Sequence, residues 1–288
     1  MRKNFLFYFH SKTRQVIFGK IFVHLLLIIG AIMVSLPFFW MISTALKKPG
    51  TEFTWPIEWI PKPLHWENFP RAWRMLPFNR WLINTLTITL FTIIGNLLSC
   101  SLVAYGFARI DFPGRDVLFI IVLSSMMLPY PVTMIPLFLL FKSLGWIDTF
   151  KPLIVPSFFG VSAFYIFLMR QFFTTIPKEY DEAARIDGCN SLDIYRYIAL
   201  PAIKPALGIV AIFSFMGSWN DFLGPLIYLS STDRFTLALG LRFFQGQWQV
   251  DWVHLMAASL IVVCPCIILF FMAQRYYIQG IVVTGLKG

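Results

Sequence analysis

Trp219, Asn220 and Asp221 are the residues whose chemistry best suits contact with a solute, and they interrupt a strongly apolar stretch. An indole ring offers an apolar face on which a sugar ring can stack, while amide and carboxylate groups can hydrogen-bond to hydroxyls. Asp221 is the only acidic residue in a segment apolar enough to cross a membrane, and such residues usually face a cavity or a partner. A structural role competes: Trp219 can be an interfacial anchor, with Asn220 and Asp221 capping a helix break before Gly224 and Pro225.

Motifs for covalent or phosphate chemistry are missing from the sequence. It has no Gly-x-x-x-x-Gly-Lys-Ser/Thr loop to hold the phosphates of ATP, no Gly-x-Ser-x-Gly and no His-Glu-x-x-His. The cysteines and histidines show no metal-ligand or disulfide spacing; they are Cys100, Cys189, Cys264, Cys266, His10, His24, His65 and His254. We therefore expect no catalytic, cofactor or metal site, and any use of ATP requires a separate protein.

The composition is that of an all-α polytopic membrane protein. Of 288 residues, 58% are hydrophobic and 13% are charged, against roughly 25% charged in a soluble domain. The net charge of +10 comes from basic residues that are scattered over loops without a dense run. Attraction to anionic lipid and topological signalling explain them better than binding of nucleic acid.

The chain divides into a basic tail at 1–20, a transmembrane domain at 21–277 and a short tail at 278–288. Segment 47–80 is polar, with prolines and tryptophans interleaved, and is expected to lie on the lipid headgroups. Six spans place both termini on one side of the membrane. The expected spans cover about 21–46, 81–107, 117–141, 151–173, 203–229 and 254–277.

Individual spans carry features that predict bends and helix contacts. A bend is expected at Pro37 in the first span. Asn84 and Asn96 in the second are expected to hydrogen-bond to a neighbouring helix. The third contains Pro129, Pro131 and Pro136. Because freed carbonyls need partners inside a membrane, residues 128–136 predict a broken helix, either beside the translocation path or as a purely structural kink.

A polar island at 174–202 separates the fourth and fifth spans. Pro177 suits the first turn of a short helix, and the acidic residues that follow favour its N-terminal half. Tyr180, Ala183 and Ala184 recur at helical spacing, so one narrow face is apolar and small. The island is therefore expected to present a docking face to a partner.

The same island predicts a turn and a second short helix. Gly188 can end the first helix in the left-handed conformation. Asn190 and Ser191 are good caps for the second helix, with Asp193 three residues after Asn190. Pro201 is expected to end it, because the residue before a proline is pushed out of helical geometry. The product is a helix–turn–helix arm outside the bilayer.

The island also carries a family motif, Glu-Ala-Ala, three residues, Gly, nine residues, Ile-x-Leu-Pro, and every defining position is met. This motif resembles the signature loop of permease subunits of bacterial ABC importers. The resemblance implies that this loop couples the chain to an ATPase in the cytoplasm. The residues that would carry the coupling are Glu182, Ala183, Ala184, Asp187, Gly188, Ile198, Leu200 and Pro201.

The likeness extends over nearly the whole chain and is strongest to the carbohydrate-uptake, maltose-type branch. It implies a second permease subunit, two ATPase subunits that bind ATP and Mg²⁺, an extracytoplasmic solute-binding protein, and a sugar as substrate. In this branch Gln245, Gly246 and Gln247 would contact the binding protein. The tail residues Gly285, Leu286, Lys287 and Gly288 would reach the ATPase.

Orientation follows from the same resemblance, which places the loop and both termini in the cytoplasm of a bacterial inner membrane. Counting Lys and Arg gives 14 on that side and 10 on the other, a bias of the right sign. Two alternatives stay open. One is the same architecture carrying a solute that is not a sugar. The other is an ATPase-independent secondary transporter, for which Asp221 alone is a thin proton relay.

Overall fold

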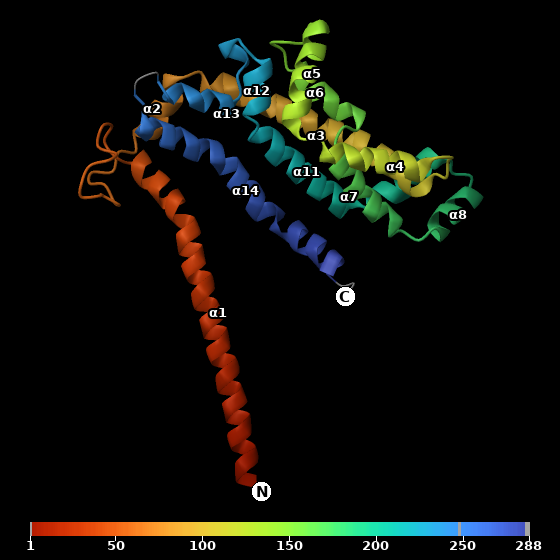
Figure 1. Ribbon diagram of the computed structural model, residues 1–288, viewed down its shortest axis with the longest axis horizontal. Coiled ribbons are helices and arrows are strands. Elements are labelled where there is room, and N and C mark those ends of the chain that lie inside the picture. Colours follow the sequence, from red (N-terminus) through yellow and green to blue (C-terminus); the bar gives the residue numbers. More distant parts are fainter. Residues whose placement is uncertain (1, 247–248, 286–288) are drawn as a thin grey trace. The chain divides into compact units, whose positions relative to one another are not determined.

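The computed structural model describes the backbone of residues 2–246 and 249–285, and the side chains of residues 19–246 and 249–274. The described residues form helices joined by turns and loops, without a β-strand, which confirms the expected all-α class (Figure 1). Short 3₁₀ and π turns lie between several helices. The α-helices are α1 Arg2–Ala45, α2 Asn68–Met75, α3 Phe78–Arg109, α4 Arg115–Ser124, α5 Tyr130–Ser143, α6 Lys151–Ile154, α7 Ala163–Thr174, α8 Glu179–Ile186, α9 Ser191–Ile194, α10 Leu200–Ala202, α11 Lys204–Trp219, α12 Leu223–Tyr228, α13 Leu237–Gly240 and α14 Trp252–Gly285.

The chain forms two compact units. The first comprises residues 1–72 and 246–260, and the second comprises residues 73–245 and 261–288. The arm and the expected solute-contact residues all belong to the second unit.

Four helical stretches are long and apolar enough to cross a membrane: Gly19–Ala45, Phe78–Arg109, Lys151–Thr174 and Trp252–Gln274. Two bent helix pairs raise the number to six if each pair is one span. The described residues therefore give four to six candidate spans, in agreement with the prediction of about six. Pro37 lies inside α1, which continues through it to Ala45.

The third span is broken where the prolines predict. A 3₁₀ turn ends at Met127, Leu128 is extended, and α5 starts after Pro129. The two halves, Arg115–Met127 and Tyr130–Ser143, are bent by 100°. Pro136 lies inside α5, so the break itself is confined to the start of the expected 128–136 segment.

The fifth span, expected at about 203–229, is broken where the structural reading of Asn220 and Asp221 predicts a helix break. Its helix α11 ends at Trp219, Asn220 leaves helical geometry, and a short α12 resumes at Leu223. At its other end, α11 is bent by 79° from the preceding stretch Ser191–Ala202. The break at Asn220 lies between apolar stretches, so the polar pair Asn220 and Asp221 before Gly224 and Pro225 indicates it, not the hydropathy pattern.

The second unit is organised around α3, which packs against α7 and α11 (Figure 1). Asn96 donates from Nδ2 to the Ser214 hydroxyl of α11 at 3.1 Å. Asn84 donates to the carbonyl oxygens of Asp233 and Phe235 at 2.8 and 2.9 Å. Both amides are buried, so these bonds satisfy groups that would otherwise be costly. The expected helix contact is confirmed for Asn96, whereas Asn84 holds a loop.

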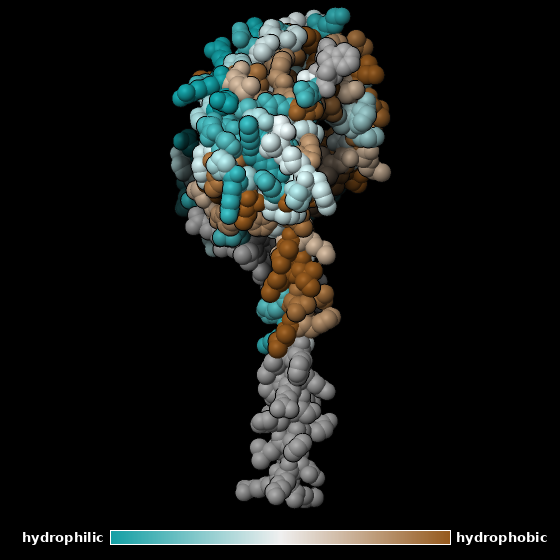
Figure 2. Space-filling view, turned by 90° about the vertical axis from the view of Figure 1, so that its left-hand side faces the viewer, coloured by the Kyte–Doolittle hydropathy of each residue, from teal (hydrophilic) through white to brown (hydrophobic). Residues whose placement is uncertain are grey.

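In the first unit, α1 leaves long apolar side chains exposed along its described length, as Figure 2 shows. Its C-terminal end is held by Asn68, which donates to the carbonyl oxygens of Ala45 and Lys47 at 2.9 and 2.8 Å. Lys47 is buried, and its Nζ donates to the Glu52 carbonyl at 3.1 Å and lies 4.7 Å from the centre of the Trp40 ring. An apolar exterior of this kind suits lipid or another membrane subunit.

Candidate functional site

The arm between the fourth and fifth spans has the predicted helix–turn–helix form. Helix α8 covers Glu179–Ile186, and Gly188 follows it with a φ of +86°, the left-handed conformation expected for a residue that ends a helix. Asn190 begins α9 with its side-chain oxygen accepting the N–H groups of Leu192 and Asp193 at 2.9 and 3.1 Å. Asp193 in turn accepts the Asn190 N–H at 3.1 Å. These reciprocal bonds form a capping box, which confirms the predicted cap at Asn190.

Replacing Asn190 by alanine should loosen the start of α9. The variant leaves two helix N–H groups without an acceptor, which costs about 1 kcal/mol at a helix N-cap. Amide hydrogen exchange at Leu192 and Asp193 should accelerate roughly fivefold, whereas Ser191→Ala, whose hydroxyl forms no cap bond, should leave it unchanged. Equal acceleration in both variants would show that the cap does not order the turn.

The helix after the turn does not end at Pro201. It widens into a π turn over Tyr195–Ala199, in which the Leu200 N–H bonds to the Tyr195 carbonyl, and then continues through Pro201 to Ala202. The wider turn relieves the clash between a proline ring and the carbonyl four residues earlier. The chain leaves helical geometry at Ile203 instead, so the prediction for Pro201 was wrong.

The small residues of the motif face two different ways. Ala184 is 6% exposed and lies in the core with Tyr105, Phe173 and Ile194, whereas Ala183 is exposed. The expected single face of Tyr180, Ala183 and Ala184 is therefore corrected: Ala184 lets the arm approach its own bundle. Ile198 and Leu200 also pack, half-buried, against this core.

Arg109 anchors the first helix of the arm, a role that the motif does not reveal. This last residue of α3 places Nη1 3.6 Å from Asp181 Oδ2 and donates from Nη2 to the Ile176 carbonyl at 2.7 Å. The two side chains are 4% and 14% exposed, so solvent screens the pair weakly. The sequence signal was a lone arginine at the end of a long apolar helix.

Other side chains of the arm are exposed. Glu182, Ala183, Asp187 and Pro201 are exposed. Large apolar side chains accompany them: Ile186 is 87% exposed, and Tyr180, Leu192 and Tyr197 are also exposed. A mixed acidic and apolar surface on a segment fixed from behind is typical of a docking surface for another protein.

Trp219 does not present its ring as a stacking platform. It is 2% exposed, its Nε1 donates to the Val262 carbonyl of α14 at 3.0 Å, and its ring stacks on Phe215 at 5.2 Å. Neither the sugar-stacking role nor the interfacial anchor describes this conformation. Trp219 instead packs α11 against α14.

Asn220 and Asp221 lie at the break between α11 and α12. Asn220 is exposed, and its Nδ2 donates to the Met216 carbonyl at 2.9 Å. Asp221 accepts the Gly224 N–H at 3.0 Å and is partly exposed. This geometry shows the expected helix break before Gly224 and Pro225, capped by Asp221. A contact of these residues with a solute stays a prediction.

Two other predicted sites lie only partly within the residues that the structure describes. Gln245 and Gly246 are exposed, and the Gly246 N–H bonds to the Gln249 carbonyl at 3.1 Å. Gln247 lies outside the described residues. Gly285 is the last residue of α14, while Leu286, Lys287 and Gly288 lie outside the described residues.

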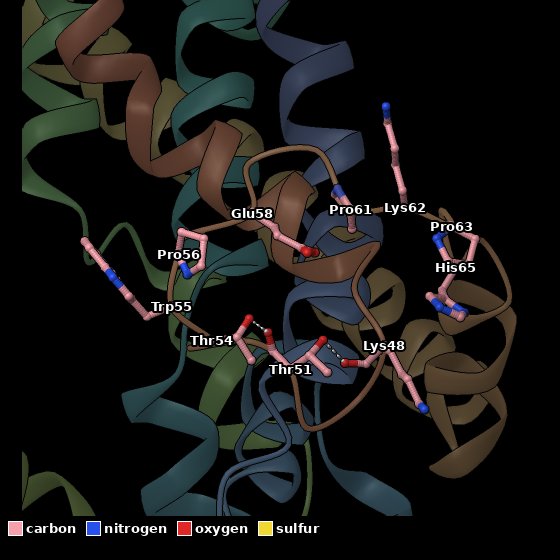
Figure 3. A pocket seen from close by; sticks show the side chains of 10 residues that line it. All are labelled: Lys48, Thr51, Thr54, Trp55, Pro56, Glu58, Pro61, Lys62, Pro63 and His65. Carbon is pink, nitrogen blue, oxygen red and sulfur yellow. Dashed lines mark hydrogen bonds between the residues drawn. The ribbon is translucent and has the colours of Figure 1, made fainter.

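The loop after α1 encloses a pocket of about 370 Å³ with a charged and aromatic rim (Figure 3). Within the loop, the Thr51 hydroxyl donates to the Lys48 carbonyl at 2.8 Å, and the Thr54 hydroxyl donates to the Thr51 carbonyl at 3.2 Å. In Figure 3 the amino groups of Lys48 and Lys62 point away from one another and outward. The pocket thus has a mixed polar and apolar lining, and its two lysine amino groups do not converge.

The loop between α5 and α6 is tied to the segment after α12 through Asp148. Its carboxylate accepts the Ser231 hydroxyl at 2.5 Å and the N–H groups of Ser231 and Ser230 at 2.9 and 3.0 Å, and Arg234 Nη1 lies 3.3 Å away. The Ser231 hydroxyl, the two N–H groups and the arginine lower the pKa of Asp148 from 3.8 to about 2.

A lowered pKa means that the folded state favours the carboxylate. Its contribution to stability is full above pH 3.8 and is lost as the pH falls through about 2. The ¹³C shift of the Asp148 carboxyl should therefore titrate near pH 2, and Ser231→Ala should move that midpoint upward. A titration midpoint of Asp148 near pH 3.8 in the unaltered protein would show that these hydrogen bonds do not stabilise its carboxylate.

Comparison with known proteins agrees with this arrangement. Residues 98–283 match the family model described as binding-protein-dependent transport system inner membrane component. The arabinooligosaccharides transport system permease protein AraQ of Bacillus subtilis is 39% identical over 209 residues, 73% of this chain and 74% of that protein. The probable ABC transporter permease protein YurM of the same organism is 32% identical, covering 94% of this chain and 89% of YurM.

Among solved structures, a bacterial ABC transporter involved in the import of the acidic polysaccharide alginate shares the fold with a TM-score of 0.81. It is 24% identical, and the match covers 91% of this chain and 96% of that chain. The family match spans more than half of the chain and includes the whole arm. This chain therefore belongs to the family of binding-protein-dependent transport system inner membrane components, the permease subunits of ABC importers.

Proposed function

We propose that this chain forms half of the translocation path of a carbohydrate importer, together with a second permease subunit. Relatives named for arabinooligosaccharides and for diacetylchitobiose support a sugar as the solute. The chain itself is a transport subunit, and its sequence lacks a phosphate-binding loop for ATP. ATP and Mg²⁺ would bind two separate ATPase subunits.

The observation that carries the proposal is the two-sided arm. Its inner side is fixed by Arg109, Ala184 and Tyr195, while its outer side presents Glu182 and Ile186 to solvent. A rigid protrusion of this kind can be pushed or pulled by a partner without unfolding. We propose that each ATPase receives one such arm, and that closure of the ATPases tilts the attached spans as semi-rigid bodies.

Orientation and the remaining contacts follow from the docking. The arm and both termini would face the cytoplasm, in agreement with the 14 to 10 distribution of Lys and Arg. The loop at Gln245 and Gly246 would then face the extracytoplasmic binding protein, and the tail from Gly285 would face the ATPases. A solved alginate importer was crystallised with its periplasmic protein, which supports this type of assembly.

One alternative has specific support. The relative named for sn-glycerol-3-phosphate is 29% identical over 270 residues, and that solute is a phosphorylated polyol rather than a sugar. The same architecture could thus carry another small polar solute. A screen over several solutes separates these cases.

The test reconstitutes the chain with its second permease, ATPases and binding protein in lipid vesicles. Uptake and ATP hydrolysis are measured with arabinotriose, diacetylchitobiose, sn-glycerol-3-phosphate and methionine. We expect an oligosaccharide to stimulate both and methionine to stimulate neither. Stimulation by sn-glycerol-3-phosphate alone would favour the alternative solute. Uptake by this chain alone, driven by a proton gradient without ATP, would overturn the proposal.

A further inference from the structure

Helix α3 holds the arm at one end and the segment 232–245 at the other. We propose that α3 is the strut that carries the signal between the ATPase side and the binding-protein side of this subunit. This inference rests on the proposed function, because it needs the arm and the segment 232–245 to lie on opposite sides of the membrane. It adds a route and named positioning residues to that function.

At the arm end, three side chains at a spacing of four residues line one stripe of α3. Ser101 bonds the Tyr195 hydroxyl at 2.7 Å, Tyr105 donates to the Ser191 carbonyl at 3.1 Å, and Arg109 pairs with Asp181. The Tyr105 ring also contacts those of Phe173 and Tyr195 at 5.6 and 5.2 Å. The stripe therefore contacts the π turn, the start of α9 and the first turn of α8.

At the opposite end, another three side chains of α3 hold the segment after α12. Trp81 Nε1 donates to the Thr232 carbonyl at 2.8 Å, and Asn84 binds the carbonyls of Asp233 and Phe235. Thr85 Oγ1 accepts the Leu237 N–H at 2.9 Å. Phe78 and Trp81 further stack on Phe244 and Phe243, which directly precede Gln245.

The length of α3 connects these two ends across a membrane. Its 32 residues rise about 48 Å at 1.5 Å per residue, more than the ~40–45 Å of a bilayer with headgroups. No proline interrupts it. A helix that is packed along its length transmits displacement rather than absorbing it, because packed interiors are weakly compressible.

The helices that directly flank the arm lack this continuity. Before the arm, α7 has 12 residues and is preceded by a 3₁₀ turn that ends at Gly160, whose φ is +64°. After the arm, α11 has 16 residues and ends at the Asn220 break. Such breaks absorb φ/ψ changes. In the second unit, the unbroken route from arm to far end is therefore α3, which is not adjacent to the arm in sequence.

The experiment uses the complete complex in nanodiscs with binding protein loaded with arabinotriose. Thr85→Val removes the acceptor for Leu237 N–H at one end, and Tyr105→Phe removes the bond to Ser191 at the other. Thr87→Val is the matched control, since its hydroxyl bonds only the Ile83 carbonyl of its own helix. The readout is the ratio of stimulated to basal ATP hydrolysis, with assembly checked by size-exclusion chromatography.

If α3 carries the signal, each single variant removes the same share of the stimulation, on the order of fivefold, the low end of typical coupling between sites. The double variant then loses no more than either single one. Thr87→Val alone leaves the stimulation ratio at the wild-type value. Combined with Tyr105→Phe, it leaves the ratio at the value of Tyr105→Phe alone. Should Tyr105→Phe fail to assemble, Ser101→Ala replaces it, because it removes the neighbouring bond to Tyr195.

Independent losses that multiply to roughly 25-fold in the double variant would overturn the strut, since distant sites without a shared route combine additively in free energy. Unchanged stimulation in Thr85→Val would also overturn it. A wild-type complex that responds to none of the four solutes in the uptake screen would defeat the proposed function, and the strut with it. Multiplying losses in a responsive complex would defeat the strut alone.

Discussion

Glu182→Lys should separate ATP hydrolysis from transport while leaving the protein inserted and folded. The side chain is exposed on α8 and forms no side-chain hydrogen bond or ion pair with the residues that the structure describes, so reversing its charge should leave the fold intact. If it meets a basic group in the ATPase, losing that pair from a desolvated interface costs about 2–5 kcal/mol. Uptake in vesicles should therefore fall at least roughly thirtyfold, with normal amounts of the subunit in the membrane.

A matched control distinguishes docking from general electrostatics. Asp116 is also an exposed carboxylate, in the first turn of α4 and outside the arm, so Asp116→Lys should keep uptake within about twofold. Uptake by Glu182→Gln should lie between that of Glu182→Lys and that of Asp116→Lys, because the amide can still hydrogen-bond without the charge. Normal uptake in Glu182→Lys would show that this surface does not dock an ATPase.

The second large effect is expected at Gly95, where α3 crosses the 3₁₀ turn of residues 155–159. A Cβ there would overlap the Ser157 hydroxyl and approach Phe158 Cδ2 to 2.8 Å. Ser157 is held by its bond to the Ile154 carbonyl and by the Ser99 hydroxyl, so it has little room to move. Gly95→Ala should lower the free energy of unfolding by about 1–3 kcal/mol through overpacking.

Gly106, on the same helix, provides the opposite expectation. A Cβ at this position meets nothing within 4 Å, so alanine adds helix propensity without a clash. Gly106→Ala should raise the free energy of unfolding by up to about 1 kcal/mol. Both variants are compared by detergent-induced unfolding in mixed micelles. Equal effects would show that the crossing at Gly95 is not close-packed.

Local features of the arm were readable without coordinates because they depend on neighbouring residues. The left-handed Gly188 and the capping box at Asn190 depend on residues at most three positions away. The broken third span follows from the same kind of rule, since three prolines remove helix donors wherever they lie. Pro201 is the exception, because the preceding π turn accommodates its ring.

The direction in which a side chain points could not be predicted in this way, because it depends on which helices pack against one another. Trp219 is a plausible solute platform by composition, but α14, arriving from more than 30 residues away, covers it and takes its N–H. Ala184 and Ala183 are adjacent and identical in type, yet α3 and α7 bury the first and leave the second exposed. Arg109 has no partner until the arm folds back toward it.

Hydropathy and turn chemistry thus predicted an all-helical membrane protein with a protruding arm, since both follow from local composition and short-range sterics. The permease assignment came from the resemblance of the motif to a known family, which the family match shows. Which side chains anchor that arm, and which face outward for a partner, was decided by long-range packing around α3. Hydrogen bonds such as Tyr105 to Ser191 join residues far apart in the chain, and their existence depends on the three-dimensional crossing of helices.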